Sequence, residues 1–149
     1  MAFETEEADM PAFALVNCIA TQDLERLTGL LERQDFLVIR LDGTNVTDKA
    51  SFLKQAEADL PRPTDLFPHN WDALADTLWN GLFDLKANQV ALVWTQAQRL
   101  AHGDLQDFLD AIRILSDVAR QVMDGANSFP RPLTMLLFLV GDGSEFRRL

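Results

Sequence analysis

Three stretches of the chain are almost continuously apolar and have the length of β-strands. They are residues 36–41, 90–94 and 133–140. Strands without polar alternation are usually covered on both faces, as in a parallel sheet between layers of helices. By length alone the third stretch also fits a short buried helix. Pro132 before it and the Gly-Asp-Gly sequence at 141–143 after it favour a strand.

The segments between these runs have the spacing of amphipathic helices. The pattern predicts helices over residues 47–59, 70–83 and 104–123, with Thr47 as the N-cap of the first. The Leu-Pro-Arg-Pro sequence at 60–63 ends that first helix, because proline lacks a backbone donor. Each connection between strands then contains a helix, as parallel crossovers require. We therefore predict an α/β fold, a three-stranded parallel sheet covered by helices.

The first part of the chain reads as an added unit. Residues 1–34 form a predicted N-terminal extension on a domain at 35–149, with a candidate strand at 13–19 and a helix capped by Thr21. The strand would be added at an edge of the sheet. At the other end of the chain, we expect the tail after residue 140 to be loosely held.

The charge of the chain narrows the classes of partner. With 23 acidic and 13 basic residues the net charge is −10, which disfavours nucleic acid and anionic membranes and favours a basic protein. The single cysteine, Cys18, excludes an intrachain disulfide. The N-terminal residues are acidic where a secretory signal is basic, and no apolar stretch is long enough to span a membrane. These features predict a cytoplasmic protein.

Little in the sequence resembles catalytic machinery. His69 and His102 lack a third ligand nearby in sequence, and there is no glycine-rich phosphate loop, nucleophile elbow or Cys/His cluster. We therefore expect no enzyme activity, no metal site and no cofactor.

The predicted helix at 70–83 has two distinct faces. One face is a core stripe formed by Trp71, Leu74, Leu78 and Leu82; the other carries Asp72, Asp76, Trp79 and Phe83. Between Arg62 and Lys86 there is no lysine or arginine to neutralise the two acids. Like charges one helical turn apart disfavour folding slightly, so their presence indicates a role in binding.

A purely structural interpretation of the same helix stays open. Asn70 is a good N-cap, Asp72 complements the helix dipole in the first turn, and Trp79 fits a place in the core.

The order of elements and two local motifs resemble the barstar family, intracellular inhibitors of barnase-type bacterial ribonucleases. The motifs are Asn-Trp-Asp-Ala-Leu at 70–74 with Asp76 after it, and Leu-Val-Trp at 92–94. The resemblance covers residues 36–140. In that family a helix and the loop before it plug the active site of the ribonuclease, and helix acids occupy the space of a substrate phosphate.

The resemblance assigns a contact surface by position. Asp76 would meet the basic catalytic groups of the ribonuclease, with Asp72 one turn before it. The implied partner-binding residues are Leu66, Phe67, His69, Asn70, Asp72, Asp76 and Trp79. The family also uses an acidic residue of the last helix, and both Asp117 and Arg120 fit that position.

Three departures concern the identity of the target. The chain has no tyrosine, so Leu66 stands where the family has a stacking aromatic; Pro68 replaces a glycine, and Trp79 a small residue. The predicted function is a barstar-like inhibitor or immunity protein that blocks a basic ribonuclease. The alternative is a barstar-fold regulatory or assembly protein without inhibitory activity, for which a homodimer burying the acidic helix would be evidence.

Overall fold

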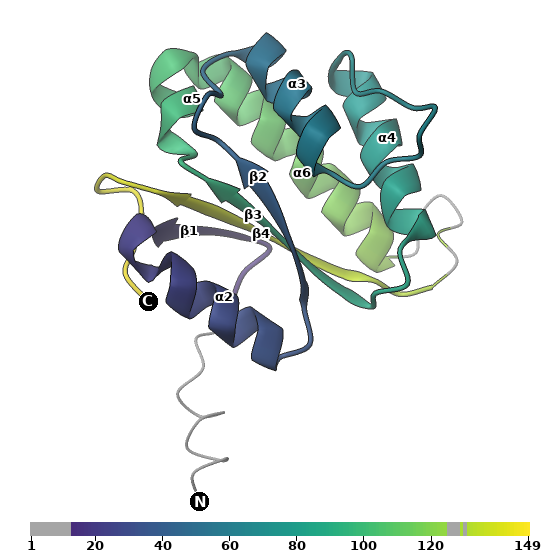
Figure 1. The fold of residues 1–149 in the computed structure, drawn as a ribbon, viewed down its shortest axis with the longest axis horizontal. Helices are drawn as coiled ribbons and strands as arrows, with labels where there is room; N and C mark the ends of the chain where they lie inside the picture. Colours follow the sequence, from purple (N-terminus) through teal and green to yellow (C-terminus); the bar gives the residue numbers. More distant parts are fainter. Residues whose placement is uncertain (1–12, 125–128, 130) are drawn as a thin grey trace, which may run out of the picture.

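The computed structural model describes residues 13–124, 129 and 131–149, which form three layers (Figure 1). The middle layer is a sheet of four parallel strands in the order β1-β4-β3-β2. Its strands are β1 (Val16–Ala20), β2 (Leu37–Asp42), β3 (Gln89–Thr95) and β4 (Thr134–Gly141). The predicted parallel sheet is confirmed, and the third apolar run is a strand. The sheet has four strands and not three, because the candidate strand at 13–19 is present as β1 and pairs with β4 at the edge of the sheet.

The helices lie on both faces of this sheet. Helix α2 (Leu24–Arg33) covers one face, and α3 (Lys49–Asp59), α4 (Trp71–Asp84), α5 (Gln98–Gly103) and α6 (Leu105–Asp124) cover the other (Figure 1). A short 3-10 helix, η1 (Thr21–Asp23), leads into α2.

Two predicted N-caps, Thr47 and Thr21, were wrong. Helix α3 is capped by Asp48, whose carboxylate accepts from the Ser51 backbone N–H at 2.8 Å, while the Ser51 hydroxyl oxygen accepts from the Asp48 N–H. This reciprocal pair satisfies two backbone donors. The N-cap is therefore Asp48, one residue later than the predicted Thr47. Thr21 lies in the 3-10 turn, and α2 starts after it without a side-chain cap.

The apolar run of β3 is continuous because each face of this inner strand packs on a different hydrophobic core. On β3, Val90, Leu92 and Trp94 belong to the core beneath α3, α4, α5 and α6. The alternate residues Ala91 and Val93 belong to the second core, with residues of α2. All five are at most 2% exposed. Alternation of side chains along the strand therefore leaves no position facing water.

A chain of aromatic contacts fixes α4 relative to the sheet. The Phe52 ring of α3 lies 5.7 Å from the Trp71 ring at the start of α4 and 5.1 Å from the Trp94 ring of β3. Trp94 in turn lies 5.6 Å from Phe108 of α6. These tilted ring pairs are favourable beyond the area they bury. The first turn of α4 is thereby held against two other helices through one buried tryptophan.

The end of the chain is held more firmly than the sequence predicts. The Arg147 N–H donates to the Cys18 carbonyl at 3.0 Å, and the Arg147 carbonyl accepts from Ala20 at 2.7 Å. The Leu149 N–H donates to the Asp23 carboxylate at 2.9 Å. The expectation of a loose tail was wrong, because the exposed edge of β1 offers backbone partners to it. The division of the chain at residue 34 stays a prediction, and residues 1–12 lie outside the described part.

Among the described residues, no helix is both long enough and apolar enough to cross a membrane.

Candidate functional site

Helix α4 begins at a side-chain cap and is anchored by its apolar stripe. The Asn70 Oδ1 accepts a hydrogen bond from the Ala73 backbone N–H at 2.7 Å. Leu74, Leu78 and Leu82 are 1%, 2% and 0% exposed, and Trp71 is half-buried. The core stripe predicted from sequence is therefore the inward face of α4, and the opposite face of the helix points outward.

Two carboxylates stand on that outward face. Asp72 and Asp76 are exposed and lie one helical turn apart. Within the described residues neither side chain has a hydrogen-bond or ion-pair partner, whereas on α6 Asp117 pairs with Arg120 at 3.2 Å. The carboxylates of Asp72 and Asp76 are thus available to cations from outside the molecule.

Two basic side chains near α4, Arg131 and Lys49, make contacts other than with Asp72 and Asp76. Arg131 donates to four backbone carbonyls at the end of α4 and just beyond it: those of Leu82, Phe83, Leu85 and Ala87. Lys49 of α3 lies 5.5 Å from the centre of the Trp71 ring. A cation at the C-terminus of a helix complements the helix dipole. Arg131 therefore stabilises the far end of α4, and among the described residues no hydrogen bond or ion pair joins it to Asp72 or Asp76.

The loop at residues 63–69 leads into the helix in a defined conformation. The Leu66 N–H donates to the Pro63 carbonyl at 3.2 Å, closing a turn. The Phe67 carbonyl accepts from the His69 backbone N–H at 2.9 Å and contacts its ring Nδ1 at 3.0 Å. Because a carbonyl only accepts, this contact is a hydrogen bond in the tautomer that has its proton on Nδ1. Pro68 is buried, and Phe67 is 49% exposed.

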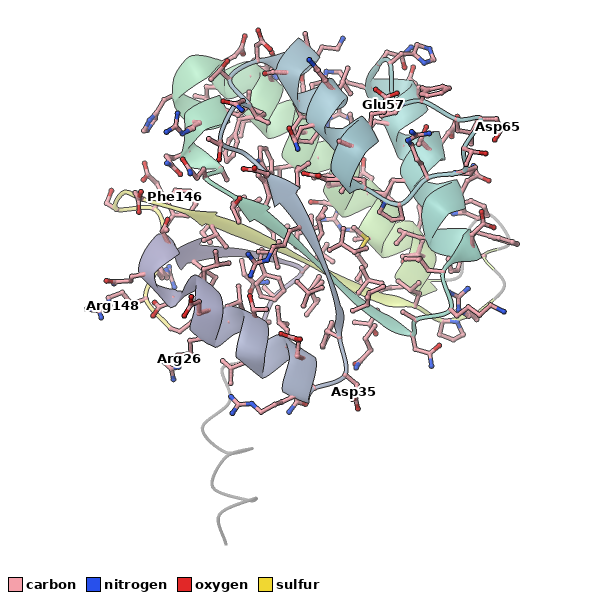
Figure 2. All side chains as sticks on the ribbon, in the orientation of Figure 1. Arg26, Asp35, Glu57, Asp65, Phe146 and Arg148 are labelled. Atoms are coloured by element: carbon pink, nitrogen blue, oxygen red, sulfur yellow. The ribbon has the colours of Figure 1, made fainter. Side chains whose placement is uncertain are left out.

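The loop projects beside α3 and α4 at the surface of the molecule. Asp65 lies at its outer tip, and Glu57 of α3 lies beside the loop (Figure 2). Of the seven predicted contact residues, the structure brings six into one continuous stretch of loop and first helical turns: Leu66, Phe67, His69, Asn70, Asp72 and Asp76.

Trp79 occupies a different environment. It is half-buried against the main core, and its ring lies 5.6 Å from Phe83 and 5.2 Å from Phe129. Its indole N–H is buried without a partner in the described structure. The interpretation of Trp79 as a core residue therefore accounts for part of its surface. The exposed aromatic on this side of α4 is Phe83, at 43%.

A hollow separates α4 from α6 beside Asp76. It is lined by Ala75, Asp76, Trp79, Asn80 and Gln121. Asn80 and Gln121 were not predicted, and Gln121 could not have been, because only the packing of α6 against α4 brings it there. Of the two positions proposed on α6, Asp117 lies one turn before Gln121 on the same side of the helix.

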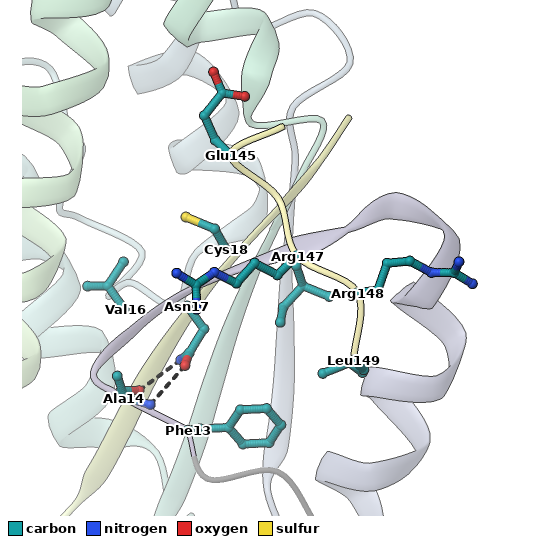
Figure 3. A pocket seen from close by; sticks show the side chains of 10 residues that line it. Phe13, Ala14, Val16, Asn17, Cys18, Glu145, Arg147, Arg148 and Leu149 are labelled. Atoms are coloured by element: carbon teal, nitrogen blue, oxygen red, sulfur yellow. Dashed lines mark hydrogen bonds between the residues drawn. The ribbon is translucent and has the colours of Figure 1, made fainter. Parts of the chain in front are cut away.

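A second hollow lies at the edge of β1, between that strand and the C-terminal tail (Figure 3). The Arg147 side chain runs along it past Asn17, and the Cys18 side chain also lines it (Figure 3). Burial raises the pKa of the Cys18 thiol above 9.0, although Arg147 opposes this. The thiol is therefore protonated at neutral pH and a poor nucleophile.

No group of three or more His, Cys, Asp or Glu side chains that could hold a metal ion occurs in residues 13–124, 129 and 131–149.

Comparisons with known proteins bear on the fold and the family. The family model described as "Barstar (barnase inhibitor)" matches residues 36–135. No curated protein matches the chain. Among solved structures, the chain is similar to the Aeropyrum pernix ORC1 protein in complex with DNA, at 17% identity and a TM-score of 0.45. That match covers 90% of this chain and 34% of the other, and it is too distant to indicate a function.

Proposed function

The chain belongs to the barstar family, and we propose that it binds a basic ribonuclease and blocks the active site with helix α4 and the loop at 63–69. One observation carries the proposal. Asp72 and Asp76 are exposed one turn apart on a rigid helix, without a cationic partner among the described side chains. Such a pair costs a little stability in the free protein, and a positive surface of a partner would offset that cost.

The proposed mechanism is occupancy of a phosphate site. Carboxylate oxygens accept charge-assisted hydrogen bonds from lysine and histidinium, and paired bonds from arginine, as phosphate oxygens do. Asp76 would enter the basic centre of the ribonuclease, and Asp72 would bind nearer its rim. The loop with Leu66, Phe67 and His69 would cover the adjoining surface. In this mechanism the chain excludes the RNA and performs no chemistry, so no cofactor or metal is required.

The charge of the whole chain supports the same partner. A net charge of −10 attracts a basic enzyme over several ångströms and increases the rate of encounter. Salt screens this attraction, so the association rate should fall as ionic strength rises. The proposal places the chain in the cytoplasm of a bacterium, where it would neutralise the ribonuclease before secretion.

The experiment is a titration of a barnase-type ribonuclease with wild-type protein and two variants, followed by RNA cleavage and binding. Asp76→Ala should weaken binding by about 2 kcal/mol or more, or about 30-fold, as expected for a central charge that is desolvated in the complex. Asp72→Ala should weaken it less, because this residue lies nearer the loop edge. Neither change should alter the unfolding midpoint much, because both side chains are exposed.

Asp84→Ala is the matched control. It removes the same charge from the exposed end of the same helix, two turns beyond Asp76. Binding that depends on total charge alone would fall equally in all three variants. If wild-type protein binds no ribonuclease, or if both Asp72 and Asp76 prove dispensable, the regulatory or assembly alternative becomes the better account.

A further inference from the structure

One side chain holds the loop that precedes α4. The Arg62 Nε donates to the Glu57 carbonyl of α3 at 3.0 Å. Its Nη1 lies within hydrogen-bond distance of three loop carbonyls, those of Pro63 at 3.3 Å, Thr64 at 3.4 Å and Leu66 at 3.1 Å. A planar guanidinium with five N–H groups is suited to such a set, because its donors diverge in one plane. The loop is thus tied to α3 and to itself through one residue.

The Glu57 carbonyl needs this donor. In a continuing helix it would accept from the residue four positions later, which is Pro61 and has no N–H. Arg62 supplies the missing hydrogen bond and places its charge at the negative end of the α3 dipole. The sequence Pro-Arg after the helix therefore both ends α3 and satisfies its last turn.

The same guanidinium supports the exposed aromatic of the loop. The Arg62 carbon Cζ lies 4.8 Å from the centre of the Phe67 ring, and that ring is 49% exposed. Stacking of a guanidinium on an aromatic ring is favourable and restricts both side chains. Phe67 is therefore presented to solvent on a fixed platform.

The two ends of the loop are also fixed. At the start, the Pro61 backbone packs directly on Gly81 of α4, where an added Cβ would lie 1.9 Å from the Pro61 carbonyl oxygen. At the end, Asn70 caps α4. Between these points, Arg62 provides the internal order. A loop that is already ordered loses less conformational entropy when it binds.

We propose that Arg62 is a positioning residue, which sets the loop at 63–69 in its binding conformation before a partner arrives. The inference rests on the proposed function for its consequence in binding, but the ordering of the loop can be tested without a partner. The positive charge of Arg62 is surrounded by carbonyl oxygens, so it contributes to loop geometry and not to attraction of a basic enzyme. This gives a directional expectation: removing a cation near a basic partner should strengthen binding, whereas loss of loop order should weaken it.

The first measurement is amide hydrogen exchange of Arg62→Gln in the free protein. The N–H groups of Leu66 and His69, which are bonded within the loop, should exchange at least about tenfold faster than in wild type. The amide of Leu78 in the buried stripe should keep its rate. Arg62→Lys, whose compact ammonium can neither bridge four carbonyls nor stack, should restore protection only in part.

The second measurement is association with a barnase-type ribonuclease by stopped flow. If the binding-competent conformation of the loop becomes a minor state in Arg62→Gln, the apparent affinity falls in proportion to the population of that state. We expect a loss of about tenfold or more, mainly through a slower association rate. Lys86→Gln removes an exposed cation that follows α4 and should leave the affinity unchanged or slightly increased.

Unchanged exchange at Leu66 and His69, or tighter binding by Arg62→Gln, would overturn the proposal. Failure of the wild-type chain to bind the ribonuclease would instead count against the proposed function, and the exchange rates would still decide the role of Arg62. If Arg62→Gln does not fold, Arg62→Lys gives the same comparison, and wild-type protection in that variant would overturn the role of the guanidinium.

Discussion

Two glycines in helices allow the same substitution to be compared in opposite surroundings. Gly81 lies within α4 and Gly29 within α2. An alanine Cβ at position 81 would lie 1.9 Å from the Pro61 carbonyl oxygen, 2.3 Å from its carbonyl carbon and 2.8 Å from the Arg62 nitrogen. At position 29 it would meet nothing within 4 Å. The local helical preference is the same in both cases, so the difference reports the packing of the loop on α4.

The magnitude follows from two opposing terms. Replacing glycine by alanine inside a helix stabilises it by about 0.5–1 kcal/mol. At Gly81 the Pro61 oxygen would have to retreat by about 1.1 Å to reach even 3.0 Å, and it belongs to backbone, not to a flexible side chain. Overpacking of this kind destabilises by about 1–3 kcal/mol. We therefore expect Gly29→Ala to stabilise the protein and Gly81→Ala to destabilise it by up to about 2 kcal/mol.

The assay is urea unfolding monitored by circular dichroism, with the free energies of unfolding compared at a common slope. The two variants should differ by about 1–3 kcal/mol, which is the overpacking term alone. A stabilised Gly81→Ala protein, or a difference below about 0.5 kcal/mol, would refute the close packing of the Pro61 backbone on α4 and with it the fixed base of the loop.

Further predictions concern the core, a helix cap and the thiol. Leu78→Ala, at 2% exposure, should lower the free energy of unfolding by about 2–5 kcal/mol in the same assay, with little effect on binding apart from the loss of folded protein. Hydrogen bonds from Ser51 hold the pKa of Asp48 below 3.8, so its stabilising charge is present above that pH and lost as the pH falls through the lowered pKa. The stability advantage of wild type over Asp48→Asn should accordingly shrink below pH 3.8 in acid titrations followed by fluorescence, and an advantage constant with pH would contradict this. Because burial raises the pKa of Cys18, alkylation at pH 7 should be slower than for a free cysteine in a peptide, and urea should remove the difference.

The local sequence predicted much of α4 correctly because the relevant physics is local. Asn70 caps the helix through a hydrogen bond to a residue three positions away. The stripe of Leu74, Leu78 and Leu82 follows from the helical repeat, which also places Asp72 and Asp76 on the outer side. The Asn-Trp-Asp-Ala-Leu motif carried the family resemblance, and the family match at 36–135 agrees with it.

Two predicted N-caps were nonetheless wrong, and in each case neighbouring residues determine where the helix starts. Thr47 and Asp48 are both suitable N-cap residues. Asp48 is the N-cap because it forms reciprocal side-chain-to-backbone hydrogen bonds with Ser51. At the start of α2, a 3-10 turn takes the place of the cap expected at Thr21. Helical spacing is the same for either start, so it does not distinguish between them.

Only the tertiary structure decided how the strands pair and what surrounds the acidic helix. The pairing of β1 with β4 joins residues 16–20 to residues 137–141, and the Arg147 backbone then covers part of that edge. Gln121 reaches the hollow beside Asp76 because α6 packs on α4.

The determinants of the binding loop show the same division. In the sequence, Arg62 is only a cation between two prolines. Its hydrogen bonds to four carbonyls and its contact with the Phe67 ring are evident only in the folded chain. Spacing along the chain fixes which side chains share a face of a helix or strand. Which face of which element then comes within 4 Å of another is set by packing of the whole core, and sequence periodicity carries no information about it.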